Sequence, residues 1–187
     1  MKKAVICSLM MLAVSNSALA DSEESLYEID RSGFYIGVDA APTELSTPSV
    51  TKDLSGGYTL QAGYDYQLNE SIVIALEAEY QNLGEGLGLD FDGLGLNVKP
   101  KYYFNLDDHD GFYVAGLLGM KEYLMNAAVG FMNTREGSGS VFGIEIGYEF
   151  SNGFMVKSGH KQGDTRFDNV TEDAEFTTNY IGVAYKF

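Results

Sequence analysis

The chain has one cysteine, three prolines and no tryptophan among its 187 residues. Cys7 lies in an apolar run that we expect to be removed, so the mature chain would form no disulfide and no cysteine-ligated metal site. After that run, no segment contains eighteen consecutive apolar residues, which argues against a membrane-spanning helix. There are 12 basic residues against 27 acidic ones, so the chain repels nucleic acid, which carries the same sign of charge.

The first twenty residues are typical of a cleaved export signal. Lys2 and Lys3 precede an apolar run, and Ala18-Leu19-Ala20 forms a small-residue cleavage site. The run is too short to span a bilayer, for which a helix needs about 20 apolar residues. We therefore predict a signal peptide at residues 1–20, an acidic periplasmic leader at residues 21–32 and one domain at residues 33–187.

The chain is rich in glycine and aromatic residues, a composition typical of many strands joined by tight turns. From residue 142 to 150, apolar side chains at even positions alternate with glycine and glutamate at odd positions. A helix cannot separate these two sets, because its period is 3.6 residues. The same alternation occurs in eight segments of roughly the length of a tilted membrane-spanning strand, at residues 34–40, 58–66, 72–80, 94–104, 112–121, 141–150, 154–162 and 180–187.

The connections between these segments alternate in length. Three are short and four are long, at residues 68–71, 105–111 and 151–153, and at 42–57, 82–93, 122–140 and 163–175. Short periplasmic turns and long external loops are typical of outer-membrane barrels. We therefore predict an all-β fold, an eight-stranded antiparallel up-and-down transmembrane β-barrel. Because Leu89 and Phe91 alternate out of phase with Leu94, we also predict a β-bulge near Gly93.

The second face of the strands distinguishes a barrel from a soluble β-sandwich, which shows the same alternation. This face is rich in glycine and alanine with charges set among them, as in a narrow barrel interior. Its six acids and six bases sum to zero, as a buried ion-pair network requires. The predicted network comprises Asp39, Asp65, Glu77, Glu79, Lys99, Lys101, Lys121, Glu145, Glu149, Lys157, Lys161 and Lys186. We expect a filled interior; a small wet pore is the alternative.

Two motifs carry a family resemblance. Over roughly residues 33–187, the opening Gly33-Phe34-Tyr35-Ile36-Gly37 and the alternating run that ends at Phe187 resemble the eight-stranded outer-membrane barrels that include the OmpA membrane domain and the OmpX and Ail proteins. The resemblance implies that outer-membrane assembly machinery reads the last alternating residues. The assembly-signal residues are Ile181, Val183, Tyr185 and Phe187.

No catalytic, cofactor-binding or metal-binding motif is present in the sequence. His109 lies among aspartates in a predicted turn, where a solvated turn is favoured over a cation site. His160 and Ser158 share an outward face, as in membrane-embedded lipid A deacylases, but two residues along a strand lie about 6.6–6.8 Å apart. That spacing alone does not establish a nucleophile–base pair, and Gln162 stands where the deacylase pattern has serine.

The external connections hold the remaining candidates. Asp90-Phe91-Asp92-Gly93 superficially resembles a calcium loop but lacks the later ligands. The fourth long connection is acidic, and we favour a solvated surface over a cation site there. The third connection carries apolar residues that indicate either continued strands, which we favour, or an interaction surface formed by Tyr123, Leu124, Met125, Phe131 and Met132.

We therefore expect a non-enzymatic protein of the Gram-negative cell outer membrane. The family resemblance implies an envelope-structural and adhesion-type role through the external loops. The alternatives are a small diffusion porin and a lipid A-modifying barrel enzyme. The expected partners are outer-membrane lipid and lipopolysaccharide, the assembly machinery and a host or cell-surface ligand. We expect no cofactor and no nucleic acid, and we expect the protein to be a monomer.

Overall fold

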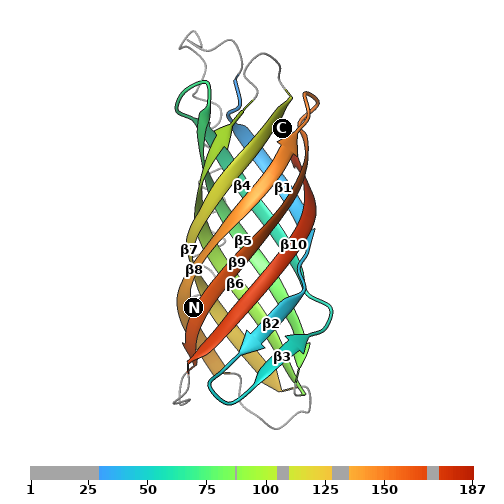
Figure 1. Cartoon of the computed structure of the whole chain (residues 1–187), viewed down its shortest axis with the longest axis vertical. Helices are drawn as coiled ribbons and strands as arrows, with labels where there is room; N and C mark the ends of the chain where they lie inside the picture. Colours follow the sequence, from blue (N-terminus) through green and yellow to red (C-terminus); the bar gives the residue numbers. More distant parts are fainter. Residues whose placement is uncertain (1–29, 87, 105–109, 128–134, 168–172) are drawn as a thin grey trace, which may run out of the picture. The chain divides into compact units, whose positions relative to one another are not determined.

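The structure, a computed structural model, describes residues 30–86, 88–104, 110–127, 135–167 and 173–187. The predicted signal and most of the leader lie outside these ranges. The described residues form one β-barrel unit that begins at Arg31 (Figure 1). Its strands are β1 (Gly33–Ala40), β2 (Thr43–Ser46), β3 (Thr51–Leu54), β4 (Tyr58–Gln67), β5 (Ile72–Gly86), β6 (Leu89–Tyr103), β7 (Gly111–Ala127), β8 (Arg135–Glu149), β9 (Phe154–Phe167) and β10 (Ala174–Lys186).

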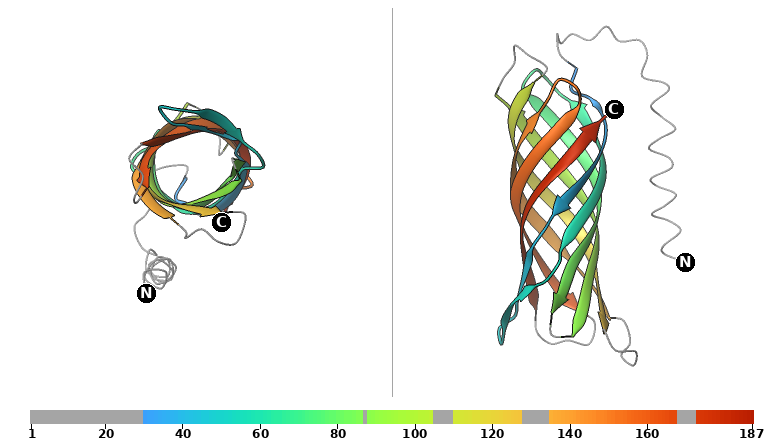
Figure 2. Two further views of the ribbon diagram at one scale, coloured as in Figure 1. Left: turned by 90° about the horizontal axis from the view of Figure 1, so that it is seen from below. Right: turned by 90° about the vertical axis from the view of Figure 1, so that its right-hand side faces the viewer.

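Eight of the strands close into a ring, which confirms the predicted fold class. From β4 to β10 each strand pairs in antiparallel fashion with the next, and β1 pairs with both β4 and β10. The view along the barrel shows this closed ring (Figure 2, left). Closure leaves no strand edge unpaired where lipid surrounds the wall, and hydrocarbon offers no hydrogen bonds to such an edge.

The two-residue alternation separates a lipid-facing belt from the interior. On β8, the Glu145 side chain is 1% exposed, whereas the preceding Ile144 is 68% exposed. Outward apolar residues recur on every strand of the ring, and aromatic residues such as Tyr66, Phe112 and Phe150 lie at its turn end, the end that holds the short connections. This distribution is typical of an apolar belt with an aromatic girdle.

Among the described residues, no helix has the length and apolar character needed to cross a membrane.

The prediction of a loop at residues 42–57 is wrong in part, because this segment contains the β2–β3 hairpin. At the loop end, opposite the turn end, β1 stops at Ala40 and β2 takes its place beside β10, with Thr43 opposite Thr178. Ser55 then bridges Glu85 on β5 through two backbone hydrogen bonds. The hairpin therefore continues the barrel wall beyond the ends of β1 and β4, as the lower part of Figure 1 shows.

The other long connections are also shorter than predicted, because the strands continue through them. β5 runs to Gly86 and β6 begins at Leu89, while β7 runs to Ala127 and β8 begins at Arg135. The continued strands favoured for the third connection are therefore present in the structure.

The bulge lies on a different strand from the one predicted. The pairing register shifts between Asn82 and Gly84 on β5, and Gly84 adopts a positive φ of 106° that favours glycine. On β6 the inward phase continues without interruption through Gly95, Gly93 and Phe91. Phe91 looked out of phase because the interior itself changes from charged to apolar at the loop end.

Candidate functional site

The barrel interior contains all twelve charged residues of the predicted network, each at most 8% exposed. Near the turn end, Asp65 lies 2.8 Å from Lys101 and 2.8 Å from Lys186, and Lys186 also lies 2.8 Å from Glu149. Every lysine of the network lies within ion-pair distance of at least one carboxylate of the network. Alternating signs allow these charges to be buried together, because an unpaired buried charge is strongly destabilising.

Two further layers of the network follow toward the loop end. In the middle of the barrel, Lys99 Nζ lies 3.1 Å from Glu77 Oε2 and 2.9 Å from Glu145 Oε2. Nearer the loop end, Glu79 pairs with Lys121 and, at 2.9 Å, with Lys161. The charges thus form successive layers along the barrel axis and leave no purely anionic or cationic lining.

Buried tyrosines complete the network, and the sequence reasoning missed them. Tyr35 donates to Glu77 at 2.8 Å, Tyr103 to Glu149 at 2.6 Å, and both Tyr113 and Tyr180 donate to Glu145 at 3.0 and 2.8 Å. These tyrosines occupy the inward phase of their strands, which was the available signal. The predicted network included charged residues alone.

Glycines on the inner face make room for the tyrosine rings. Gly63 pairs across the sheet with Tyr35 and Gly147 with Tyr113. A Cβ atom would lie 2.6 Å from the Tyr35 ring at Gly63 and 2.4 Å from the Tyr113 ring at Gly147. The abundance of glycine on the charged face therefore follows from rings that lie flat across the adjacent strand.

Arg31 closes the turn end of the interior. Its guanidinium lies 4.2 Å from the centre of the Tyr103 ring, a cation–π distance, and its side chain is buried. Its backbone N–H donates to Gln67, and its carbonyl accepts a 3.0 Å hydrogen bond from Lys186. Arg31 falls in the predicted periplasmic leader, residues 21–32, so the sequence prediction missed its role as an interior residue.

An apolar cluster closes the loop end of the interior. The side chain of Phe176 stacks on Tyr123, with ring centres 5.0 Å apart, and contacts Phe91 edge-on at 5.6 Å. The remaining buried members are Leu45, Leu54, Leu83, Phe167 and Ala174. The interaction surface predicted on Tyr123 is therefore wrong for this residue, which is 2% exposed inside the barrel.

The other residues of that predicted surface divide into two groups. Met125 is partly buried and packs against the apolar cluster, and Leu124 is half-buried on the strand β7. Phe131 and Met132 lie outside the described residues. The strand continuation, which buries Tyr123, accounts for the apolar character of the third connection up to Met125.

Outside the apolar belt, the wall continues as an acidic rim that we call the outer crown. It is the set of exposed or partly exposed charged residues at the loop end among those that the structure describes. Its ten carboxylates and three bases are Glu44, Asp53, Glu85, Asp90, Asp92, Glu122, Glu136, Asp164, Asp173 and Glu175 with Lys52, Arg135 and Arg166. All of them except Asp173 stand on paired strands, which hold their charges in fixed positions.

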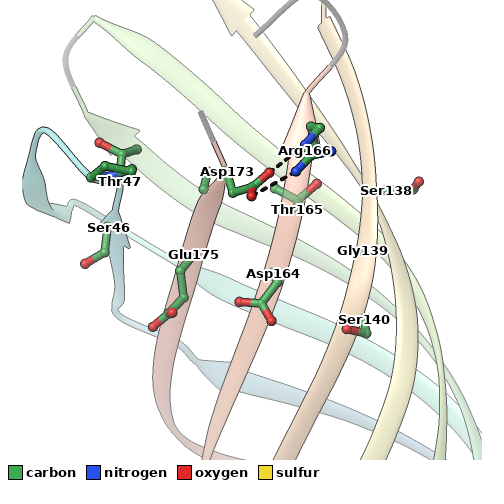
Figure 3. Close-up of a pocket in the computed structure, with 12 residues that line it drawn as sticks. Ser46, Thr47, Ser138, Gly139, Ser140, Asp164, Thr165, Arg166, Asp173 and Glu175 are labelled. Carbon is green, nitrogen blue, oxygen red and sulfur yellow. Dashed lines mark hydrogen bonds and ion pairs between the residues drawn. The ribbon is translucent and has the colours of Figure 1, made fainter. Parts of the chain in front are cut away.

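A shallow surface cavity of about 660 Å³ lies in the outer crown, between the β2–β3 hairpin and the ends of β8, β9 and β10 (Figure 3). Arg166 donates to Asp173 at 2.6 and 2.9 Å; this bonding raises the pKa of Arg166 and lowers the pKa of Asp173. Asp164 and Glu175 are cross-strand partners on the outward face. Like charges at such positions repel, so a cationic group placed between them would stabilise the pair.

Comparisons with known proteins agree with this geometry. A family model described as the outer membrane protein beta-barrel domain matches residues 4–187. The chain belongs to this family. A sequence comparison with curated proteins finds no match. The family assignment locates this barrel in the outer membrane, with its belt against lipid.

Solved outer-membrane barrels share the fold. Neisserial surface protein A superimposes with a TM-score of 0.56 at 18% identity, over 83% of this chain and 97% of that one. Ail, the attachment invasion locus protein of Yersinia pestis, gives a TM-score of 0.51 at 15% identity, over 83% and 99%. Ail in complex with the heparin analogue sucrose octasulfate gives 0.50 at 15% identity, over 84% and 100%. These identities show a shared fold alone.

The histidine that sequence reasoning considered for catalysis lies on the lipid-facing side of this outer-membrane barrel. His160 Nδ1 is 2.9 Å from Asn179 Oδ1, and the Ser158 hydroxyl donates to the Tyr180 carbonyl at 3.0 Å. Ser158 and His160 therefore each bond a group on β10, and no hydrogen bond joins the two. A nucleophile activated by its base requires such a bond.

The described part of this outer-membrane barrel contains no group of three or more histidine, cysteine, aspartate or glutamate residues placed to hold a metal ion. The acidic fourth connection is described only in part, with Asp164, Asp173 and Glu175 on the crown. His109, Asp168 and Glu172 lie outside the described residues.

Proposed function

We propose that this protein is a non-conducting, non-enzymatic outer-membrane barrel that presents its outer crown to basic ligands at the cell surface. The observation that carries the proposal is the crown of ten carboxylates and three bases, nearly all on paired strands, above a barrel whose interior is occupied by buried side chains. Charges held on paired strands need no ordering when a ligand binds, and preorganisation of this kind favours affinity. This is an adhesion-type role in which the crown supplies the contact surface.

The filled interior supports the non-conducting part of the proposal. The ion-pair layers lie between Arg31 at the turn end and the Phe176 cluster at the loop end. An ion that crossed this interior would have to displace buried partners that hold each other at about 3 Å. The interior of eight-stranded barrels has room for little more than side chains.

The sign of the crown sets the class of ligand that we propose. Ail has been solved with a sulfated heparin analogue, which is strongly anionic. The crown of this chain repels such a ligand, because its carboxylates outnumber its bases by seven. The repelling pair Asp164 and Glu175 favours a cation in the same place. We therefore propose a basic peptide segment or another polycation as the ligand.

The proposal is tested by binding to proteoliposomes of the purified protein. The probes are a lysine-rich peptide and heparin, measured at low and at physiological ionic strength. The key variant is E44K/E122K/E136K on the crown, with E70K in a periplasmic turn as the matched control. We expect wild-type protein and E70K to bind the peptide, and the triple variant to bind it at least tenfold more weakly. If the wild-type protein bound heparin as tightly as the peptide, the proposed ligand class would be contradicted. The same holds if the triple variant bound the peptide as tightly as the wild-type protein does.

Single-channel recording tests the non-conducting part separately. We expect closed bilayers with the wild-type protein and also with R31A/F176A, because the ion-pair layers between the two ends remain in place. A stable conductance in the wild-type protein would favour the alternative of a diffusion pore.

We propose two processing signals that support this location. Residues 1–20 would direct export, and Ile181, Val183, Tyr185 and Phe187 would be read by the assembly machinery. The four side chains lie on the outer face of β10 and its end, where they are between 38 and 74% exposed. Removal of Phe187 should lower the amount of folded protein in the membrane, as judged by heat-dependent gel mobility.

A further inference from the structure

A row of four outward side chains lines the cavity in the outer crown. Glu175 on β10 pairs with Asp164 on β9 and with Ser46 on β2. Ser140 on β8 continues the row, because the register between β8 and β9 places it opposite Asp164. Figure 3 shows the row across the four strands, with the two carboxylates between the two hydroxyls. Since neighbouring strands lie about 4.8 Å apart, the row is about 14 Å long.

No base of this chain neutralises the two carboxylates within the part that the structure describes. Arg166 is the one base among the described residues that line the cavity, and Asp173 already holds it through two hydrogen bonds of 2.6 and 2.9 Å. The residues of the external connections outside the described ranges, at 87, 128–134 and 168–172, include no lysine or arginine. A positive charge between Asp164 and Glu175 therefore has to come from a ligand.

The cavity is also lined by a buried hydroxyl group that has no hydrogen-bond partner among the described residues. Thr165, next to Asp164 on β9, is 4% exposed, and its Oγ1 atom makes no hydrogen bond. Figure 3 shows Thr165 close to Arg166, beyond the row of carboxylates. A buried polar group without a partner is destabilising. A ligand that brings a hydroxyl group to Thr165 would remove this cost.

The combination of carboxylates and hydroxyls indicates an amino sugar rather than a lysine side chain. An ammonium group offers three donors and no acceptor, so lysine would satisfy the carboxylates alone. A sugar hydroxyl both donates and accepts, so it also pairs with the hydroxyls of Ser46, Ser140 and Thr165. In an amino sugar, hydroxyl groups flank the ammonium on the ring, as the two serines flank the carboxylates in the row. The cavity, at about 660 Å³, has the volume of a small-molecule site.

We propose that this cavity binds an amino sugar, with the ammonium group between Asp164 and Glu175 and the hydroxyl groups on Ser46, Ser140 and Thr165. The site rests on the proposed function, because a polymer of amino sugars is one of the polycations that suit the crown. It goes further in that it names the chemical class of the ligand and the place where one unit of it is held.

The test compares three probes for binding to the purified protein in phospholipid vesicles. They are a glucosamine tetramer, its N-acetylated form, which keeps the ring hydroxyls but loses the charge, and a lysine tetramer, which keeps the charge but has no sugar hydroxyls. We expect the glucosamine tetramer to bind about tenfold more tightly than either of the others, because only this probe satisfies both the carboxylates and the hydroxyls.

Two double variants test the carboxylates of the row. D164N/E175Q removes the two charges in the cavity, and D53N/E85Q, the matched control, removes two charges of the crown outside it. We expect D164N/E175Q to bind the glucosamine tetramer about tenfold more weakly than the control does, because it loses charged hydrogen bonds as well as net charge. Heat-dependent gel mobility verifies that each variant is folded.

Two further variants remove hydroxyl groups and no charge. S46A/S140A and T165V should each weaken binding of the glucosamine tetramer about fivefold, the effect of losing neutral hydrogen bonds. Binding of the lysine tetramer should not change in either variant, because this probe makes no use of the hydroxyls.

Equal effects of D164N/E175Q and D53N/E85Q would overturn the proposal, because the overall charge of the crown would then hold the tetramer. Unchanged binding of the glucosamine tetramer by both hydroxyl variants would overturn it too. In either case tight binding of the lysine tetramer would leave the proposed function standing, since a basic ligand would still bind the crown. If neither tetramer bound the wild-type protein, both the amino sugar and the proposed ligand class would be wrong.

Discussion

Removal of the Glu145 carboxylate tests whether the interior is a dry ion-pair network. Glu145 is 1% exposed and accepts hydrogen bonds from Lys99 at 2.9 Å, Tyr113 at 3.0 Å and Tyr180 at 2.8 Å, with Lys157 at 3.6 Å. In E145L both lysines keep one other acid, but two tyrosine hydroxyls lose their acceptor and the network gains one uncompensated positive charge. Breaking a buried pair by removal of one partner costs about 3–5 kcal/mol.

The double variant K99M/E145L separates charge imbalance from lost packing. It restores neutrality to the network, because one acid and one base are removed together. Glu77 keeps hydrogen bonds from Tyr35 and Asn97, and Lys157 keeps Asp39, so we expect the double variant to be no less stable than E145L alone. The coupling between the two positions should be on the order of 1–3 kcal/mol. D173A on the outer crown is the control, because its ion pair with Arg166 is exposed and should contribute nothing measurable.

Equilibrium unfolding by urea in phospholipid vesicles, followed by circular dichroism and gel mobility, gives the free energies for these variants. These two signals are suitable because the chain has no tryptophan, so tryptophan fluorescence cannot report its unfolding. If E145L unfolds at the same urea concentration as the wild-type protein, water must solvate the lysines that lost their partner. The interior would then be a wet pore, and the non-conducting proposal would fail with it.

Three further outcomes follow from the same geometry. I144R places a charge on a residue that is 68% exposed to lipid and should cost about 2–4 kcal/mol in the same unfolding assay. G139A should separate β8 from β9 near the loop end, because a Cβ there would lie 1.5 Å from the Asp164 carbonyl oxygen; protease sensitivity of the crown on intact cells measures this. R31A should leave folding intact and increase hydrogen exchange of interior amides at the turn end, since Arg31 covers Tyr103 there; unchanged exchange would remove its role as a closure.

The ring, the lipid-facing side and the charged interior could be predicted from the sequence, because each depends on a two-residue period of apolar and polar residues. Glu145 was assigned correctly to the inner face and Ile144 to the outer face, since one is charged and the other apolar. Phe91 was not, because an apolar residue can face either lipid or an apolar interior, and periodicity alone does not say which. At the loop end the interior around Phe176 is apolar, like the outer face. The difference between charged and apolar residues, from which the two faces were predicted, is therefore absent there.

Other features were missed for different physical reasons. The β2–β3 hairpin consists of two four-residue strands, and Thr43–Ser46 is mostly polar, so it lacks the apolar alternation of a membrane strand. Its position is set by the end of β1 and by pairing with β10, which are long-range contacts. Arg31 was a single base in an acidic segment, and its burial depends on the Tyr103 ring, 72 positions away in the printed sequence.

The continuation of the strands past the belt explains how an acidic crown can stand on an outer membrane whose lipid phosphates carry the same charge. On β5, six residues separate the belt residue Tyr80 from Gly86, a rise of about 14 Å for a tilted strand. The Debye length at physiological salt is about 8 Å. Carboxylates at the top of the crown therefore lie beyond most of the repulsion from the phosphates at its base. A flexible loop would not hold its charges at that height, whereas paired strands do, and a basic ligand that reaches them need not first displace counterions from the lipid surface.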